Sequence, residues 1–283
     1  MLVPREELRF DFKGAVFDLG RLPERQLLAW VFNQFLYGEV TGIQCGHWLY
    51  EAPHLNAATF IARQATEELS HVRKILRVLT LLGEAPAAAH PAVRFLSTGM
   101  MGGSWGEHVA IEMALGEGLV LGVFYAMVDT IPEPEIHRIL DMATSEEERH
   151  CEFGEKETVD WLRAHPRTRS LLLGLALVQV IALRWLRGFV LGKLLRGDLK
   201  DHPVLRQFPE FYEHGVRAME TRIHRMGLSQ VPLEQLGLFT KLQLIVGIPF
   251  RKLLVRLTLR RRRLTATYLD DPVLRAEQAR KSS

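Results

Sequence analysis

Two short segments of the chain carry the same pattern, a glutamate followed three residues later by a histidine. The pairs are Glu68 with His71 and Glu147 with His150. On a helix, residues i and i+3 project from one face, so each pair can present a carboxylate and an imidazole together. Each pair also has one glutamate about thirty residues upstream, inside an apolar run. Together these residues match the ligands of a dinuclear metal site inside a four-helix bundle: two Glu-x-x-His motifs, Glu39 and Glu117.

This set of side chains is suited to a pair of divalent metal ions. Divalent iron and manganese prefer hard oxygen donors with some imidazole, which glutamate and histidine supply. Four carboxylates also balance the four positive charges of two divalent ions, so the predicted site is neutral overall. Without metal, four carboxylates crowded into a bundle core would be unfavourable, and some of them would hold protons.

The two single glutamates lie among apolar neighbours. An unpaired glutamate on an apolar helix face is rare, and two at matching positions are hard to explain without a ligand. Glu112 is an alternative ligand to Glu117, because both lie on one expected helix. Glu112 precedes Glu147 by 35 residues, however, whereas Glu117 precedes it by 30, close to the 29 residues that separate Glu39 from Glu68. We therefore favour Glu117.

The elements that must position these residues are helices. Helical periodicity is nearly continuous and strand signals are nearly absent, so the predicted class is all-α. A Pro/Gly/Ala-rich connection at 84–106 separates two helical hairpins, and it is far longer than a hairpin requires. Within each hairpin the single glutamate and the motif lie at similar distances from the turn, which places them at one height. The four expected helices span about Pro23–Glu51, Asn56–Leu82, Glu107–Thr130 and Glu135–Ala164.

We divide the chain into a lead-in at 1–22, a dimetal four-helix bundle at 23–166 and an additional helical region at 167–283. The additional region should begin with an apolar helix, Leu171–Leu195, followed by a break at Gly197 and Asp198 and a polar helix at about 204–226. A further helix is expected from about Leu233. A basic amphipathic stretch at 253–264 and a frayed tail at 270–283 complete the prediction.

With these motifs, residues 23–164 resemble the ferritin-like di-iron carboxylate superfamily. This superfamily includes ferritins, rubrerythrins, ribonucleotide reductase small subunits, bacterial multicomponent monooxygenases and acyl-carrier desaturases. The resemblance implies a ferritin-like four-helix bundle with extra C-terminal helices. It implies that Glu39, Glu68 and His71 hold one metal ion, with Glu68 as a bridging ligand. It likewise implies that the second ion is held by Glu117, Glu147 and His150, with Glu147 bridging.

The resemblance also implies a supporting role for the acidic residue just before each motif glutamate. In several members this residue hydrogen-bonds the histidine of the opposite motif, and Glu67 and Glu146 occupy these positions. Many relatives have aspartate there, so the longer glutamate is a departure from the family pattern. The expected cofactor is a pair of iron ions, Fe/Fe, with Mn/Fe or Mn/Mn as alternatives.

The leading functional hypothesis is an O₂-activating oxidoreductase, an oxygenase, hydroxylase or related oxidase acting on an apolar or lipid-like organic substrate. Its expected partners are O₂, the small organic substrate and an electron-donor protein. The alternatives are ferritin-like iron binding and storage, a dimetal hydrolase or peroxide-dismutating enzyme, and a bundle that serves only as an interaction protein. The extra helices argue against a ferritin shell, and two cysteines are too few for the iron–sulfur domain of a rubrerythrin.

Composition favours a cytoplasmic protein. The two cysteines, Cys45 and Cys151, form no disulfide framework, and no apolar signal segment is visible at the N-terminus. The longest apolar run, Leu171–Leu183, is too short to span a bilayer. The basic C-terminal stretch is consistent with packing on the bundle, with peripheral contact at the inner face of the membrane, or, least of all, with binding RNA. A net charge of +3 makes nucleic acid an unexpected partner, and a homodimer is compatible with the sequence.

Overall fold

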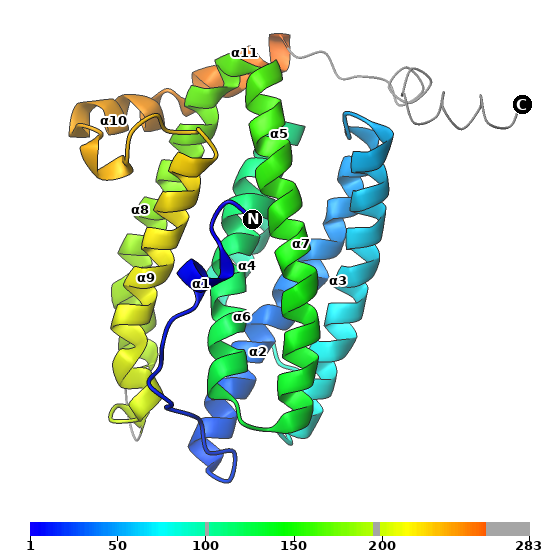
Figure 1. Ribbon diagram of the computed structural model, residues 1–283, viewed down its shortest axis with the longest axis vertical. Helices are drawn as coiled ribbons and strands as arrows, with labels where there is room; N and C mark the ends of the chain where they lie inside the picture. The colour runs from blue at the N-terminus through cyan, green and yellow to red at the C-terminus, as the bar shows by residue number, and fades with distance from the viewer. Residues whose placement is uncertain (100–101, 195–198, 259–283) are drawn as a thin grey trace, which may run out of the picture.

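The computed structural model describes residues 1–99, 102–194 and 199–258, and these residues form helices joined by turns and loops, with no strand among them. The prediction of an all-α fold is confirmed. The long helices run alongside one another through the molecule (Figure 1). Residues 259–264 of the expected basic stretch, the expected tail and the expected break at Gly197 and Asp198 lie outside the described residues.

The first helical hairpin consists of α2 (Leu22–Gly42) and α3 (Leu55–Leu81). Pro23 lies in the first turn of α2, where backbone N–H groups have no acceptor within the helix, so the missing N–H of proline costs no hydrogen bond. The expectation that α2 continues to Glu51 is wrong, because a 3-10 segment, η1 (Ile43–Tyr50), replaces its last turns. The segment η1 has the tighter hydrogen bonding of a 3-10 helix and leads into the turn before α3. Helix α3 begins after His54, whose side chain accepts a hydrogen bond from the N–H of Ala57.

The second hairpin follows a long connection that contains a short helix, α4 (Pro91–Gly99), and a single turn, α5 (Trp105–Glu107). The expected third helix is divided into a π-helical segment, η2 (His108–Glu117), and a regular helix, α6 (Gly118–Thr130). The fourth helix is α7 (Pro134–Ala164), with Pro134 in its first turn and Glu133 capping the N–H of Ile136.

The π-helical segment corrects the prediction of one regular α-helix over Glu107–Thr130. Its hydrogen bonds join residues i and i+5, which widens the helix, and such segments are frequent at functional sites. Residues five apart therefore come closer to one side of the helix than they would in an α-helix. Glu112 and Glu117 are five residues apart, and both line the same cavity.

The described part of the additional region forms a second group of helices. After a 3-10 turn, η3 (Pro166–Thr168), come α8 (Arg169–Leu194) and α9 (Pro203–Arg225), which pack against each other (Figure 1). A 3-10 turn, η5 (Leu233–Gln235), precedes two shorter helices, α10 (Leu238–Val246) and α11 (Ile248–Thr258). The helix expected from about Leu233 is thus interrupted near Gly247.

Buried side chains connect this second group to the helices that carry the predicted ligands. One hydrophobic cluster joins α8, α9 and α10 to η2 through Leu115, Leu177 and Ile223. Another joins the start of α9 to α2, α3 and α7, with Phe32 and Val78 completely buried. A buried ion pair adds to these contacts: Nε of Arg222 on α9 lies 2.7 Å from Oε1 of Glu155 on α7.

The N-terminal lead-in packs against the same helices. It contains a four-residue helix, α1 (Arg5–Leu8), whose Leu8 is buried in a cluster with Tyr125 of α6 and Cys151 of α7. The N–H of Leu2 donates to Oε2 of Glu155, so the carboxylate of Glu155 bonds both the lead-in and α9.

Two helical stretches among the described residues are long and apolar enough to cross a membrane, Trp105–Thr130 and Pro166–Gly188. The uninterrupted apolar run at 171–183 predicted a segment too short to span a bilayer. The helical stretch Pro166–Gly188 that contains this run is longer and carries few charged residues, so it does meet the length. The apolar window of Trp105–Thr130 is 61% buried inside the protein, and that of Pro166–Gly188 is 39% buried. Length and composition alone are weak support for a membrane span, because core helices meet the same criteria.

Candidate metal centre

The six residues predicted as ligands converge on one place between four helical segments. Glu39 comes from α2, and Glu117 is the last residue of η2. The two Glu-x-x-His pairs come from the middle of α3 and α7, where both helices are regular. Five of the six side chains are buried, and Glu117 is partly exposed. Potential ligand atoms form two groups, each within 4.8 Å: Glu39, Glu68, His71 and Glu147, and then Glu68, Glu117 and His150.

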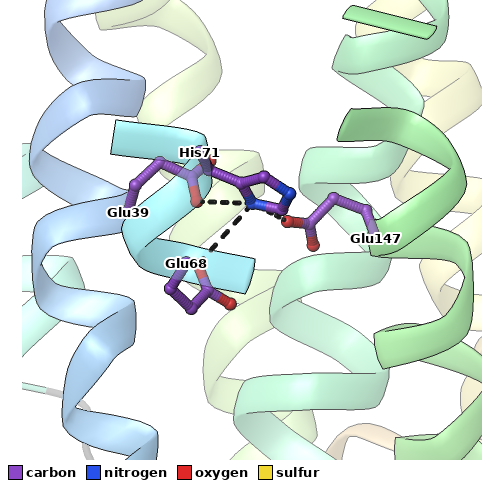
Figure 2. Close-up of side chains that lie close together, drawn as sticks. All are labelled: Glu39, Glu68, His71 and Glu147. Carbon is purple, nitrogen blue, oxygen red and sulfur yellow. Dashed lines mark hydrogen bonds and ion pairs between the residues drawn. The ribbon is translucent and has the colours of Figure 1, made fainter. Parts of the chain in front are cut away.

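The first group is arranged around the Nδ1 atom of His71 (Figure 2). This atom lies 3.1 Å from Oε2 of Glu39 and 3.0 Å from Oε1 of Glu147. Oε2 of Glu68 lies farther away, at 3.9 Å. Donor atoms about 2.1 Å from a shared ion, at right angles to one another, lie about 3 Å apart. These separations are therefore compatible with a common ion.

The second group is arranged around the Nδ1 atom of His150. It lies 3.6 Å from Oε1 of Glu68 and 3.5 Å from Oε2 of Glu147. Glu68 and Glu147 therefore each direct one oxygen toward His71 and the other toward His150. A carboxylate between two metal ions would place its oxygens in this way, and the resemblance implied bridging positions for these same two residues.

The Nε2 atom of each histidine, on the side of the ring away from the centre, contacts the carboxylate of the glutamate just before the opposite motif. Nε2 of His71 lies 2.7 Å from Oε2 of Glu146, and Nε2 of His150 lies 2.8 Å from Oε2 of Glu67. The glutamates at these positions thus reach the histidines that the resemblance assigned to them. Donation by Nε2 leaves the lone pair of Nδ1 directed into the centre, which is the tautomer a metal ligand requires.

Basic residues hold these two supporting carboxylates in place. Oε1 of Glu67 accepts hydrogen bonds from Arg63 at 2.8 Å and from Arg149 at 2.9 Å. Lys74 forms an ion pair with Glu146. Burial opposes the ionisation of Glu67, but hydrogen bonds from His150, Arg63 and Arg149 outweigh it and lower its pKa to about 2. The supporting carboxylate behind His150 is therefore ionised at neutral pH.

Burial and crowding of charge shift the pKa values of the central groups in the metal-free protein. Burial, followed by the charges of Glu147 and Glu39, raises the pKa of Glu68 well above its usual value. Burial also raises the pKa of Glu117. Burial disfavours a charged His71, but hydrogen bonds to Glu147 and Glu39 outweigh it and raise its pKa to about 10. Protons therefore balance the carboxylates in the metal-free protein.

Among the predicted ligands, two buried atoms have no hydrogen-bond partner in the described part of the chain, Oε2 of Glu117 and Nδ1 of His150. A buried polar atom without a partner is costly, and it calls for an explanation such as a water or an ion. Both atoms belong to the second group of potential ligands. The donor types, the separations and these two atoms fit a bound metal.

Gln64 contributes to the centre and was missed by the sequence analysis. Its side chain is buried, and its Nε2 donates to Oε1 of Glu117 at 2.9 Å. The signal was its position four residues before Glu68, on the same face of α3. Glu112, the alternative ligand, is bonded elsewhere: its Oε2 lies 2.8 Å from Nδ1 of His108, and it also accepts from the N–H of Gly102.

A cavity of about 450 Å³ reaches the centre, and four of the carboxylates, Glu39, Glu68, Glu117 and Glu147, form part of its wall. The rest of the wall is mainly apolar and comes from α2, η1, α4, η2, α6, α8 and α9. Helix α8 contributes Ala182, Leu183 and Leu186, so part of the region after residue 166 encloses the space next to the centre. This volume is within the range typical of small-molecule sites.

Each of the two groups of donor atoms could hold a metal ion, and an apolar space lies at one edge of them. The set of oxygen and imidazole donors suits iron or manganese. Searches against protein-family models, curated proteins and solved structures found no match to this chain.

Proposed function

We propose that this chain is a ferritin-like di-iron oxidoreductase that activates O₂ and oxidises an apolar organic substrate. One observation carries the proposal: the cluster of predicted ligands borders a mainly apolar cavity large enough for a small molecule. Metal ligands alone would be equally compatible with storage or hydrolysis. An apolar space against the ligands favours chemistry on an organic molecule.

The protein residues would divide the work in the following way. Glu39 and His71 would bind one ion, Glu117 and His150 the other, and two carboxylates would bridge them. The bound iron pair supplies the redox chemistry and the reaction with O₂. The outer carboxylates would hold both imidazoles in the ligating tautomer.

The cavity wall would position the substrate and exclude water. Phe35 of α2, Val120 of α6 and Leu183 of α8 are among its apolar members. An apolar wall binds hydrocarbon groups and is a poor path for hydrated iron ions, which an iron store would have to admit in quantity. The apolar wall thus favours oxidation over storage.

The experiment that tests this proposal is anaerobic loading with ferrous iron followed by exposure to O₂. We expect two iron ions per chain, consumption of O₂ and a transient absorbance change after mixing. The variant Glu68→Ala removes a carboxylate common to both groups of ligands and should lose both iron and the absorbance change. Arg163→Ala is a matched control, because Arg163 is an exposed residue near the end of α7 that pairs only with Asp160 among the described residues.

Three outcomes would count against the proposal. A chain that binds no iron would remove its basis. Uptake of many iron ions per chain on aeration would indicate storage. Tight binding of two ions with no reaction toward O₂, but with hydrolysis of an ester or phosphate, would indicate a dimetal hydrolase.

A further inference from the structure

The outward side of α10 and α11 is strongly apolar. On α10, Phe239 and Val246 are 81% and 77% exposed, and Leu242 is also exposed. On α11, Phe250 and Leu257 are 71% and 72% exposed, with Leu253 between them. We call these six residues the α10–α11 surface. Large aromatic and aliphatic side chains exposed in a contiguous group mark an interaction site more often than chance.

The spacing shows that each helix presents one apolar side outward. Phe250, Leu253 and Leu257 follow the i, i+3, i+7 pattern of an amphipathic helix. On α10 the opposite side is used for packing, since Leu244 is buried in the cluster shared with α8 and α9. Helix α10 therefore has apolar residues on its outward side beyond those that its packing requires.

Specific contacts fix the orientation of both helices on the protein. Nη1 of Arg251 donates to the carbonyl of Leu244 at 2.7 Å, which connects α11 to α10. Nζ of Lys252 lies 3.0 Å from Oε2 of Glu107, a buried residue of α5. Gly174 of α8 allows close approach, because a Cβ there would lie 2.8 Å from the carbonyl oxygen of Leu244. The outward position of the apolar side is therefore set by the fold.

The sequence around this surface has one sign of charge. Residues 235–269 contain eight of the 36 lysines and arginines of the chain and none of its 33 aspartates and glutamates. The rest of the chain is net acidic. Among the described residues, Lys241 lies on α10 and Arg256, which is exposed, on α11. An apolar helix side flanked by basic residues is the composition of helices that lie in the interface of an anionic bilayer.

We propose that the α10–α11 surface docks this protein onto an anionic lipid bilayer. The two helices lie in the plane of the interface, with the two phenylalanines among the acyl chains and the basic residues at the lipid phosphates. A second copy of the chain is a poorer fit, because it would bring together two copies of the segment 235–269, which has eight basic residues and no acidic residue to balance them. This proposal is independent of the metal centre.

The test is flotation of the full-length protein with vesicles of phosphatidylcholine alone or mixed with phosphatidylglycerol. We expect binding to the mixed vesicles, weaker binding to phosphatidylcholine and partial release as salt is raised. The double variant Phe239→Ser/Phe250→Ser should lower the bound fraction by about tenfold or more. Lys241→Glu/Arg256→Glu should lower it mainly by removing the preference for phosphatidylglycerol.

The matched control is Leu22→Ser/Met142→Ser, which removes two apolar side chains of 51% and 47% exposure from α2 and α7. This control should bind vesicles as the natural sequence does, and thermal unfolding should show that all variants fold. Equal binding by the Phe239→Ser/Phe250→Ser variant would overturn the proposal. So would absence of vesicle binding together with a dimer that this variant converts to monomer. Resistance of the membrane-bound protein to an alkaline carbonate wash would indicate a spanning helix instead of interfacial docking.

Discussion

Gly42 lies directly against the carboxylate of Glu68: a Cβ atom at position 42 would come within 2.9 Å of Oε2 of Glu68. The residue therefore matters because it leaves room for a carboxylate from the neighbouring helix. Gly38, one turn earlier on α2, has no atom within 4 Å of the equivalent position. The two glycines form a natural matched pair.

Gly42→Ala should weaken metal binding without unfolding the protein. The added methyl group must displace the Glu68 carboxylate, and we expect a loss of affinity of about tenfold or more. Gly38→Ala should leave affinity unchanged and add up to about 1 kcal/mol of stability, because alanine is the better helix former. Metal titration and thermal unfolding of both variants check this, and equal affinities would show that Glu68 does not bind the metal from its present position.

Glu117 and Glu112 can be distinguished by substitution. Glu117→Gln should lower the affinity of the second ion by about 100-fold or more, since a direct ligand should matter more than an outer one. Glu112→Gln should retain two ions per chain, because Glu112 is bonded to His108 and Gly102. Metal analysis after dialysis separates the two cases. The reverse result would assign the ligand role to Glu112 and require η2 to rearrange.

The carboxylates that bond Nε2 of the two histidines should affect metal affinity without binding the metal themselves. Glu67→Gln and Glu146→Gln should each lower metal affinity by about 10- to 100-fold, because each imidazole loses a charged partner that sets its tautomer. Glu148→Gln is the control, since Glu148 lies on the same helix but bonds Tyr125 and Arg5. Competition with a chromophoric chelator measures all three. An effect of Glu148→Gln as large as that of Glu146→Gln would mean that the change reflects general destabilisation.

Metal binding should release protons. The pKa of His71 is raised to about 10 by its carboxylate neighbours, and those of His150, Glu68 and Glu117 are also raised. Protonated imidazole cannot ligate, so both histidines must lose a proton at neutral pH, and apparent affinity should rise as pH rises. Calorimetric titration in two buffers of different ionisation enthalpy counts the protons released. Affinity that stays constant between about pH 6 and pH 9 would contradict the raised values.

The cavity beside the centre can be filled without touching the ligands. Ala182 of α8 lines it, and Ala182→Phe should reduce binding of an apolar fluorescent probe by about tenfold while two metal ions remain bound. Ile181→Phe is the control, because the adjacent Ile181 is 48% exposed. Fluorescence titration and metal analysis give the two readouts. Equal probe affinity in both variants would place the apolar binding site elsewhere.

The all-α class and the residues of the predicted metal centre could be predicted, because both depend on the spacing of residues that are close together in the sequence. The i, i+3 motifs and the isolated glutamates could be found by counting, and Pro132 and Pro134 mark the turn between the two helices of the second hairpin. The helix type of η2 could not be predicted, since apolar periodicity does not distinguish i+4 from i+5 hydrogen bonding over one short segment.

Contacts between segments far apart in the sequence could not be predicted either. Gln64 bonds Glu117 across 53 residues. Its position four residues before Glu68 places it on the ligand face of α3, but this spacing does not identify Glu117 as its partner. The same holds for the wall that α8 contributes to the cavity, because it depends on how α8 packs against η2. The sequence predicts an apolar helix after residue 166, but not which of its residues line this space.

The four helical segments around the centre differ in regularity. Both Glu-x-x-His pairs lie on uninterrupted α-helices, whereas Glu39 lies four residues before the 3-10 segment η1 and Glu117 ends the π-helical segment η2. A junction between helix types can adjust its backbone by exchanging few hydrogen bonds, and a regular helix cannot. We therefore expect the side of the centre that carries the imidazoles to be stiffer than the side that carries Glu39 and Glu117. A change in the separation of two bound ions would be absorbed by Glu39 and Glu117.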